Sequence, residues 1–209
     1  MKKIIFFLFL TIAFFGCQSK EEKAIKLIQS ELSKTLYDYD SYSHIETTVV
    51  EAKQNVYNDT TLWKQANFIF YTFNKTLELQ KEAEDAMEYM EIWGPPTYYS
   101  SSHSDKKYYK YKETYDKKKE EMLKTYKICK EYAKIFNDSI KNIDENKIIG
   151  WEVVHKFRCK TKGGHSTIGN YRYIIDNKME NILIFEDMDD DDYNNIRDFI
   201  ELTISGAFE

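Results

Sequence analysis

The chain has 209 residues, and its 35 acidic against 30 basic side chains give a formal net charge of −5 at pH 7. This acidic balance argues against nucleic acid as a partner, because nucleic acids are bound by clustered basic side chains that displace counterions. Only two prolines and seven glycines are present, which indicates long regular elements joined by few loops.

The first seventeen residues have the pattern of an export signal. Lys2 and Lys3 precede an uncharged run, Ile4 to Phe15, which ends at Gly16-Cys17. As a helix, the run would rise only about 18 Å, less than the roughly 30 Å of a bilayer's hydrocarbon core. We therefore expect residues 1–16 to be a signal peptide, and an uncleaved apolar anchor is the alternative.

The Gly16-Cys17 pair at the end of this run resembles the lipobox of bacterial lipoproteins, whose cysteine is acylated and becomes the first mature residue. Phe14 stands where that pattern usually has Leu, and relaxed lipoboxes of this kind are similar to those of the Bacteroidota. The following Gln18-Ser19-Lys20-Glu21-Glu22 resembles the acidic signal that sends such lipoproteins to the cell surface. The resemblance implies an outer-membrane protein, exposed at the surface and anchored through acyl chains such as palmitate on Cys17. A cleaved signal peptide with an incidental cysteine is the alternative.

Two elements are expected next. Residues 23–37 form a helix with one apolar stripe at intervals of three and four, made of Ile25, Ile28, Leu32 and Leu36. Polar residues 38–41 break this helix. The β-branched residues that follow predict a strand from Tyr42 to Lys53.

A long helical hairpin occupies residues 60–142. Its first helix runs from Thr60 to about Ile92 on a stripe of Trp63, Ala66, Phe70, Phe73, Leu77 and Ala83. Gly94-Pro95-Pro96 ends that helix, and a second one resumes near Asp105 after a polar loop. Residues 106–119 are nearly all Lys, Tyr, Glu and Asp, so we expect the end near the loop to project into solvent.

The last part of the chain predicts three strands and a helix. Trp151, Val153, His155, Phe157 and Cys159 alternate with polar residues, so they share one face of a strand. After a turn at Gly163-Gly164, strands 171–175 and 182–185 form a hairpin about Asp176-Asn177, which suits positive φ. A helix then begins near Asp189 to Asp192, with Ile196, Phe199, Ile200 and Ile204 inward.

The order of elements predicts an α+β fold: an antiparallel sheet packed with helices, with the hairpin inserted after the first strand. Residues 17–209 would form a single domain. The stretches Leu36 to Tyr42, Gly150 to Gly164 and Tyr171-Arg172-Tyr173 also resemble segments of small lipoproteins of the Bacteroidota. That resemblance implies a fold and a location and carries no activity.

The hairpin loop is a candidate site of partner binding. Tyrosines crowd around it together with Lys106, Lys107 and Lys110; they are Tyr98, Tyr99, Tyr108, Tyr109, Tyr111 and Tyr115. Aromatic side chains with polar rims suit contact with a protein or a glycan. The alternative is a solvated helix end of biased composition.

Other polar groups are weaker candidates. His155, Arg158 and His165 suggest acid–base chemistry, but alternation puts His155 and Arg158 on opposite strand faces, which favours a structural histidine. Cys129 and Cys159 either form a disulfide or are buried free thiols.

The carboxylates of the last segment fall at positions 1, 3, 5 and 12 of a calcium-loop count; they are Asp187, Asp189, Asp191 and Asp198. Asp192 stands where such a loop needs glycine, so helix capping and solubility are the preferred interpretation. We expect no metal site and no cofactor.

No motif for a nucleophile or a phosphate-binding loop is present in the sequence. We therefore expect a non-enzymatic, membrane-anchored envelope lipoprotein that uses its hairpin as a binding or structural module. A cell-surface hydrolase or transferase that uses His155 and Arg158 is the alternative. A purely structural envelope component, or an inhibitor of a secreted enzyme, is not distinguished from the first interpretation.

Overall fold

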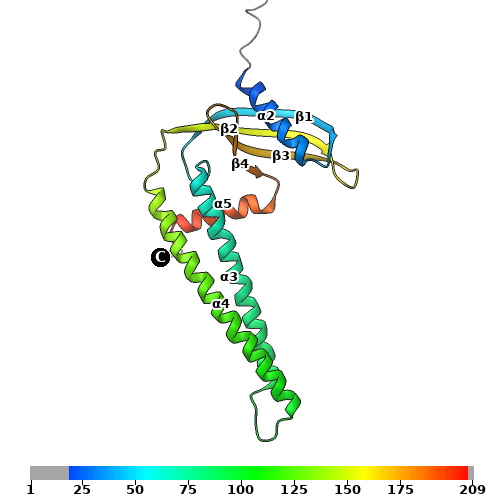
Figure 1. The fold of residues 1–209 in the computed structure, drawn as a ribbon, viewed down its shortest axis with the longest axis vertical. Helices are drawn as coiled ribbons and strands as arrows, with labels where there is room; N and C mark the ends of the chain where they lie inside the picture. The colour runs from blue at the N-terminus through cyan, green and yellow to red at the C-terminus, as the bar shows by residue number, and fades with distance from the viewer. Residues whose placement is uncertain (1–18, 207–209) are drawn as a thin grey trace, which may run out of the picture. The chain divides into compact units, whose positions relative to one another are not determined.

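The computed structural model describes residues 19–206, so Cys17 and the signal segment lie outside the described residues. The described chain folds in the order α2 (Lys20–Thr35), β1 (Asp38–Lys53), α3 (Thr60–Trp93), α4 (Ser102–Ile140), β2 (Ile148–Lys160), β3 (Ser166–Ile175), β4 (Ile182–Asp187) and α5 (Asp191–Ile204) (Figure 1). Its four helices and four-stranded antiparallel sheet make an α+β fold with a helical hairpin after the first strand, as predicted.

Contacts within the chain group it into two compact units. One unit comprises residues up to Gln54 and 145–193, with α2 and the sheet, and the other comprises residues 55–144 and those from Asn194 on. Each unit has its own hydrophobic core. The sequence predicts one domain with an insertion, and in the structure α5 packs within the unit of that insertion.

The sheet of the first unit has the order β1-β2-β3-β4. Helix α2 lies across one face and begins with a capping box, in which Ser19 and Glu22 satisfy each other's backbone N–H groups. It buries one stripe, Ala24, Ile28 and Leu32. Beneath it lie the side chains that strand alternation assigns to this face, including Val153, Phe157, Tyr173 and Ile175.

Helix α2 ends at Thr35, before the residues predicted to break it, but strand β1 begins at Asp38, so the predicted strand start at Tyr42 is wrong. The pairing with β2 shifts in register between Asp38 and Ser43. There the Ser41 hydroxyl accepts a 2.8 Å hydrogen bond from the backbone N of Lys160. Because a side-chain oxygen replaces the missing backbone acceptor, pairing continues through polar residues. Strand β3 likewise begins before the predicted residue 171, since its polar first half pairs with the end of β2.

The loop between β3 and β4 is longer than the predicted turn about Asp176-Asn177. The residue with positive φ is Met179, at 59°, and not Asn177. The Asp176 carboxylate accepts hydrogen bonds from the backbone N of Glu180 and the side-chain amide of Asn181. This carboxylate closes the loop that a two-residue turn would otherwise close.

In the second unit, α3 and α4 pack against each other as an antiparallel hairpin. Helix α3 ends at Gly94, whose φ is 64°, directly before the two prolines. The core lies where α5 joins the hairpin and contains Leu62, Ala66, Ile69 and Phe70 of α3, Cys129, Ala133 and Phe136 of α4, and Ile196, Phe199 and Ile200 of α5. Toward the loop, α4 buries no side chain before Cys129. In the half of the hairpin near the loop, few side chains are therefore buried between the two helices, as its polar sequence predicts.

Candidate functional site

The loop between α3 and α4 presents two tyrosines at its apex. The backbone N of Ser100 donates a 3.1 Å hydrogen bond to the Thr97 carbonyl, so Tyr98 and Tyr99 are the central residues of a closed turn. The Ser100 hydroxyl donates to the carboxylate of Asp105 in the first turn of α4. The two tyrosine rings meet edge to face with centroids 5.2 Å apart, and they are 95% and 92% exposed.

Behind the apex, aromatic side chains pair across the hairpin. Tyr89 of α3 stacks on Tyr111 of α4 with ring centroids 4.7 Å apart. Trp93 meets His103 edge-on at 5.7 Å, and the Lys107 Nζ lies 6.0 Å from the centre of the Trp93 indole ring. These contacts hold the two helix ends together where no large side chain is buried.

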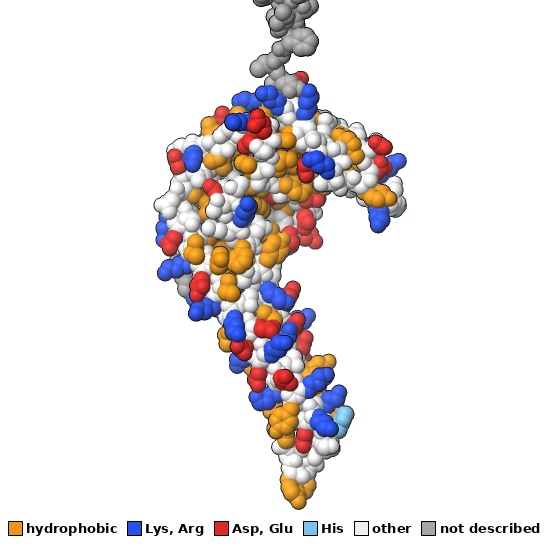
Figure 2. Space-filling model, viewed as in Figure 1, with side chains coloured by type: hydrophobic (Ala, Val, Ile, Leu, Met, Phe, Trp, Pro, Cys, Tyr) orange, Lys and Arg blue, Asp and Glu red, His pale blue; other side chains and the backbone are white. Residues whose placement is uncertain are grey.

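We call residues 92–111 the hairpin tip. Of the six tyrosines that the sequence singles out, Tyr98, Tyr99 and Tyr109 are exposed, whereas Tyr108, Tyr111 and Tyr115 are partly buried. Figure 2 shows hydrophobic side chains at the end of the hairpin with basic ones beside them. Three lysines of the tip, Lys106, Lys107 and Lys110, form no ion pair with a described acidic group. The tip is thus an aromatic and basic surface.

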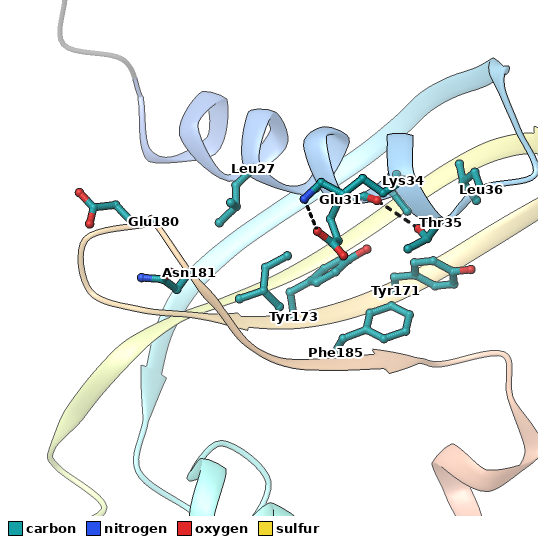
Figure 3. A pocket seen from close by; sticks show the side chains of 12 residues that line it. Leu27, Glu31, Lys34, Thr35, Leu36, Tyr171, Tyr173, Glu180, Asn181 and Phe185 are labelled. Atoms are coloured by element: carbon teal, nitrogen blue, oxygen red, sulfur yellow. Dashed lines mark hydrogen bonds and ion pairs between the residues drawn. The ribbon is translucent and has the colours of Figure 1, made fainter.

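Sequence reasoning missed a groove of about 590 Å³ in the first unit (Figure 3). Helix α2 lies closest to β1 and leaves Phe185 of β4 exposed and Tyr171 of β3 partly exposed, whereas Tyr173 between them is buried. The floor consists of three rings in mutual contact, Tyr171, Tyr173 and Phe185. At the rim, Glu31 is paired with Lys34, and Asn181 donates to Asp176. The groove therefore offers apolar surface and few free polar groups that would orient a ligand.

His155 lies completely buried on the face of β2 that α2 covers. Its Nε2 is 3.0 Å from the Tyr42 hydroxyl and its Nδ1 is 2.8 Å from the Thr47 hydroxyl, so both ring nitrogens have partners. Burial, assisted by nearby His44, lowers the pKa of His155 to about 4. The ring is therefore neutral at neutral pH, as suits a histidine of the core.

Arg158 is exposed on the opposite face of β2, and His165 is exposed in the turn before β3. Strand residues an odd number of positions apart point to opposite faces, so His155 and Arg158 share no pocket. The structure thus does not bring together the pair on which the hydrolase or transferase interpretation depends.

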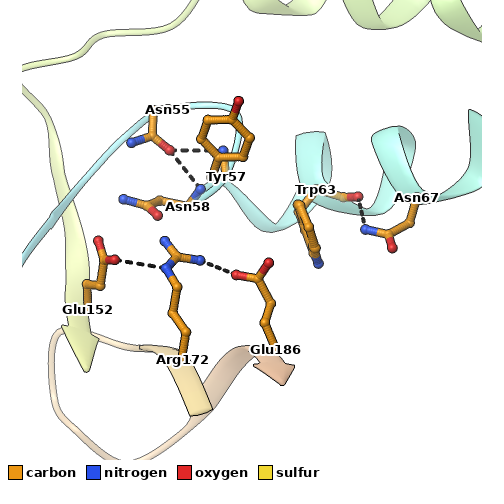
Figure 4. Close-up of polar contacts among 8 residues, drawn as sticks. All are labelled: Asn55, Tyr57, Asn58, Trp63, Asn67, Glu152, Arg172 and Glu186. Atoms are coloured by element: carbon orange, nitrogen blue, oxygen red, sulfur yellow. Dashed lines mark hydrogen bonds and ion pairs between the residues drawn. The ribbon is translucent and has the colours of Figure 1, made fainter. Parts of the chain in front are cut away.

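A buried ion cluster spans three neighbouring strands of the sheet. Arg172 of β3 donates from Nε to Glu152 of β2 at 2.8 Å, and from Nη1 to Glu186 of β4 (Figure 4). Arg172 and Glu186 are directly opposite in the register and almost fully buried. Buried charges persist only when they are paired, so we assign this cluster to the integrity of the sheet.

Two carboxylates of this acidic segment accept local backbone hydrogen bonds, and of these only Asp187 belongs to the calcium-loop count. The Asp187 carboxylate accepts from the backbone N of Asp189, and the Asp190 carboxylate accepts from that of Asp192. In residues 19–206, no group of three or more His, Cys, Asp or Glu side chains is placed to hold a metal ion.

Cys129 and Cys159 are both buried free thiols, so the disulfide alternative is wrong. Burial raises the pKa of the Cys129 thiol to about 11. Because the thiolate is the reactive form, this cysteine is inert at neutral pH.

Comparisons with protein-family models, curated protein sequences and solved structures gave no match for this chain. No helix in the described part of the chain is both long enough and apolar enough to cross a membrane. Among the large hydrophobic side chains of residues 19–206, Tyr98 and Tyr99 are the most exposed. The hairpin tip is accordingly the strongest candidate for a functional surface.

Proposed function

We propose that this chain is a non-enzymatic binding module of the bacterial envelope that contacts its partner with the hairpin tip. The observation that carries the proposal is the fixed turn at which Tyr98 and Tyr99 point outward. Aromatic side chains that are held in place before binding lose little conformational entropy when a partner covers them. Exposed rings on a locked turn are therefore well suited to recognition.

The proposal includes an acylated Cys17 that anchors the module in the outer membrane, with the folded part at the cell surface. Its support is the lipobox-like sequence. Mass spectrometry of the mature N-terminus should find an acylated cysteine in the wild type. In Cys17→Ala the chain should leave the membrane fraction, and a wild-type chain without acyl groups would remove the anchor from the proposal.

The binding role is tested by a photo-crosslinking amino acid at position 98 in intact cells, with the same group at position 117 as control. Position 117 is exposed on the same helix pair but lies outside the tip. We expect adducts from position 98 and none from position 117. Equal labelling from both positions, or none from position 98, would count against a binding tip.

A further inference from the structure

We infer that the partner of the hairpin tip is a lipid bilayer surface rich in anionic headgroups, a proposal that rests on the proposed use of the tip for binding. The first support is charge. The tip carries three lysines and one carboxylate, Asp105, in a chain whose net charge is −5. The Asp105 carboxylate already accepts a hydrogen bond from Ser100. With Asp105 still ionised, the tip keeps an excess of two positive charges, which attracts an anionic surface.

The second support is the kind of side chain at the apex. Tyrosine and tryptophan have an apolar body and a polar end, and they are enriched where a bilayer meets water. Besides Tyr98 and Tyr99, the tip exposes Ile92 and Tyr109, while Trp93 is half-buried. A lysine can bury its aliphatic stem and keep its ammonium group among the headgroups. This composition matches a surface that enters the interfacial layer of a membrane.

The third support is the depth at which each group lies. Lys106 and Lys110 are four and eight residues after the start of α4 at Ser102, so they stand about 6 and 12 Å along the helix from the loop. Interfacial elements bury their apolar groups roughly 5–10 Å deep. With the tyrosines at the acyl boundary, the lysines reach the level of the lipid phosphates.

The area of the tip disfavours a protein or a glycan. Tyr98 and Tyr99 are 95% and 92% exposed, and at about 150–250 Å² for each aromatic side chain the apex falls short of the roughly 800 Å² that a standard protein interface takes from each partner. A bilayer surrounds an inserted tip on all sides, so a narrow apex is sufficient. Glycan sites add polar groups that fix the ligand's orientation, and the carboxylate of this tip is engaged with Ser100.

The experiment is vesicle sedimentation with residues 18–209, which contain both hydrophobic cores and lack the acylation site, so that no acyl chain contributes to binding. The vesicles are phosphatidylcholine alone, or phosphatidylcholine with phosphatidylglycerol at 3:1. We expect binding to the anionic vesicles, weakened by salt, and little binding to the neutral ones. Circular dichroism and thermal unfolding verify that each variant is folded.

Two tip variants are compared with a matched control. Lys106→Gln/Lys107→Gln/Lys110→Gln should weaken binding about fivefold per lysine, roughly a hundredfold in total. Tyr98→Ser/Tyr99→Ser should weaken it by about tenfold or more. The control, Lys64→Gln/Lys81→Gln/Lys130→Gln, removes the same charge from exposed positions of the hairpin outside the tip and should bind like the wild type.

The outcomes separate this inference from the proposed function. Binding that is lost in both tip variants and kept in the control supports the lipid surface. Equal losses in the control, or equal binding to neutral vesicles, overturn it. If no vesicle is bound but position 98 still crosslinks to a protein or glycan in cells, the lipid inference fails and the binding function stands. If no vesicle is bound and position 98 forms no crosslink in cells, both the lipid inference and the proposed binding function fail.

Discussion

His155 of β2 lies directly opposite Thr47 of β1, and its Nδ1 is 2.8 Å from the threonine hydroxyl. Tyr42 occupies the other ring nitrogen, so a neutral imidazole is fully hydrogen-bonded in the core. A protonated ring would be a buried charge, which explains why folding lowers the pKa of His155 from 6.5 to about 4.

We expect the free energy of unfolding to fall as the pH is lowered. Because the folded-state pKa lies below the unfolded one, the stabilisation is fully present above pH 6.5 and is lost as the pH falls through 4. The difference corresponds to about 3 kcal/mol. Urea unfolding between pH 7 and pH 5 should show a flatter pH dependence for His155→Gln than for the wild type. His165→Gln serves as the exposed control, and equal slopes in all three proteins would contradict the assignment.

The Arg172 cluster predicts strong coupling between two strands. Arg172→Met should lower the free energy of unfolding by about 3–5 kcal/mol, since the cation that balances the buried Glu186 is lost. Adding Glu186→Leu should recover part of the loss. A double-mutant cycle by urea denaturation measures the coupling, and the exposed pair Lys124 and Glu120 gives the control, for which we expect less than about 1 kcal/mol. Similar couplings in both cycles would show that the cluster is not a buried ion pair in solution.

Three glycines should differ in how well they tolerate alanine. A Cβ at Gly150 would lie 2.1 Å from the Ile175 carbonyl oxygen, and one at Gly169 would lie 2.6 Å from the Phe157 ring. At Gly163 the nearest atom belongs to the His165 side chain, 3.3 Å away. Backbone atoms can move away from a new Cβ less easily than side-chain atoms can. Gly150→Ala should therefore lower the melting temperature most and Gly163→Ala least. For Gly169→Ala we expect the free energy of unfolding to fall by about 1–3 kcal/mol. The reverse order would mean that the sheet register differs in solution.

The hydrogen bonds of the turn at the hairpin tip predict that a substitution there changes the opening of the loop but not the global stability. Asp105→Ala removes one of the two acceptors within reach of the Ser100 hydroxyl and leaves the Thr97 carbonyl. Asp105 belongs to neither hydrophobic core, so global stability should change by less than about 0.5 kcal/mol. The loop should open more often, and chymotrypsin should cleave faster after Tyr98 or Tyr99. Asp116→Ala, on the same helix, is the control. Unchanged cleavage in Asp105→Ala would show that Ser100 and Asp105 do not hold the turn.

Much of the fold followed from local patterns. Gly94 before two prolines marks the end of α3, and alternation assigns Val153 and Phe157 to the covered face. Alternation assigns a face but no register, so it could not reveal that Arg172 lies opposite Glu186. The polar start of β1 was missed because the hydroxyl of Ser41 replaces a backbone acceptor.

The helix stripes were predicted less well at their ends. Leu77 and Ile204 are exposed although a fixed spacing of three and four puts them inward, and Thr76 and Leu79 take the inner positions beside Leu77. The tyrosines of the tip could be found from composition. The role of Ser100 and Asp105 depends on a loop geometry that composition does not encode, and the groove beside α2 depends on which strands the helix covers.

The two helices of the hairpin keep a constant register, with Tyr89 stacked on Tyr111, Glu82 paired with Lys118 and Phe68 against Tyr132. Between the core and the tip, α3 and α4 pack against each other and against no other described helix or strand. Removing one heptad from each helix there would preserve these pairings and bring the tip about 10 Å closer to the core. The hairpin is therefore a spacer whose length can vary in steps of two helical turns, while the folded base and the recognition end stay the same.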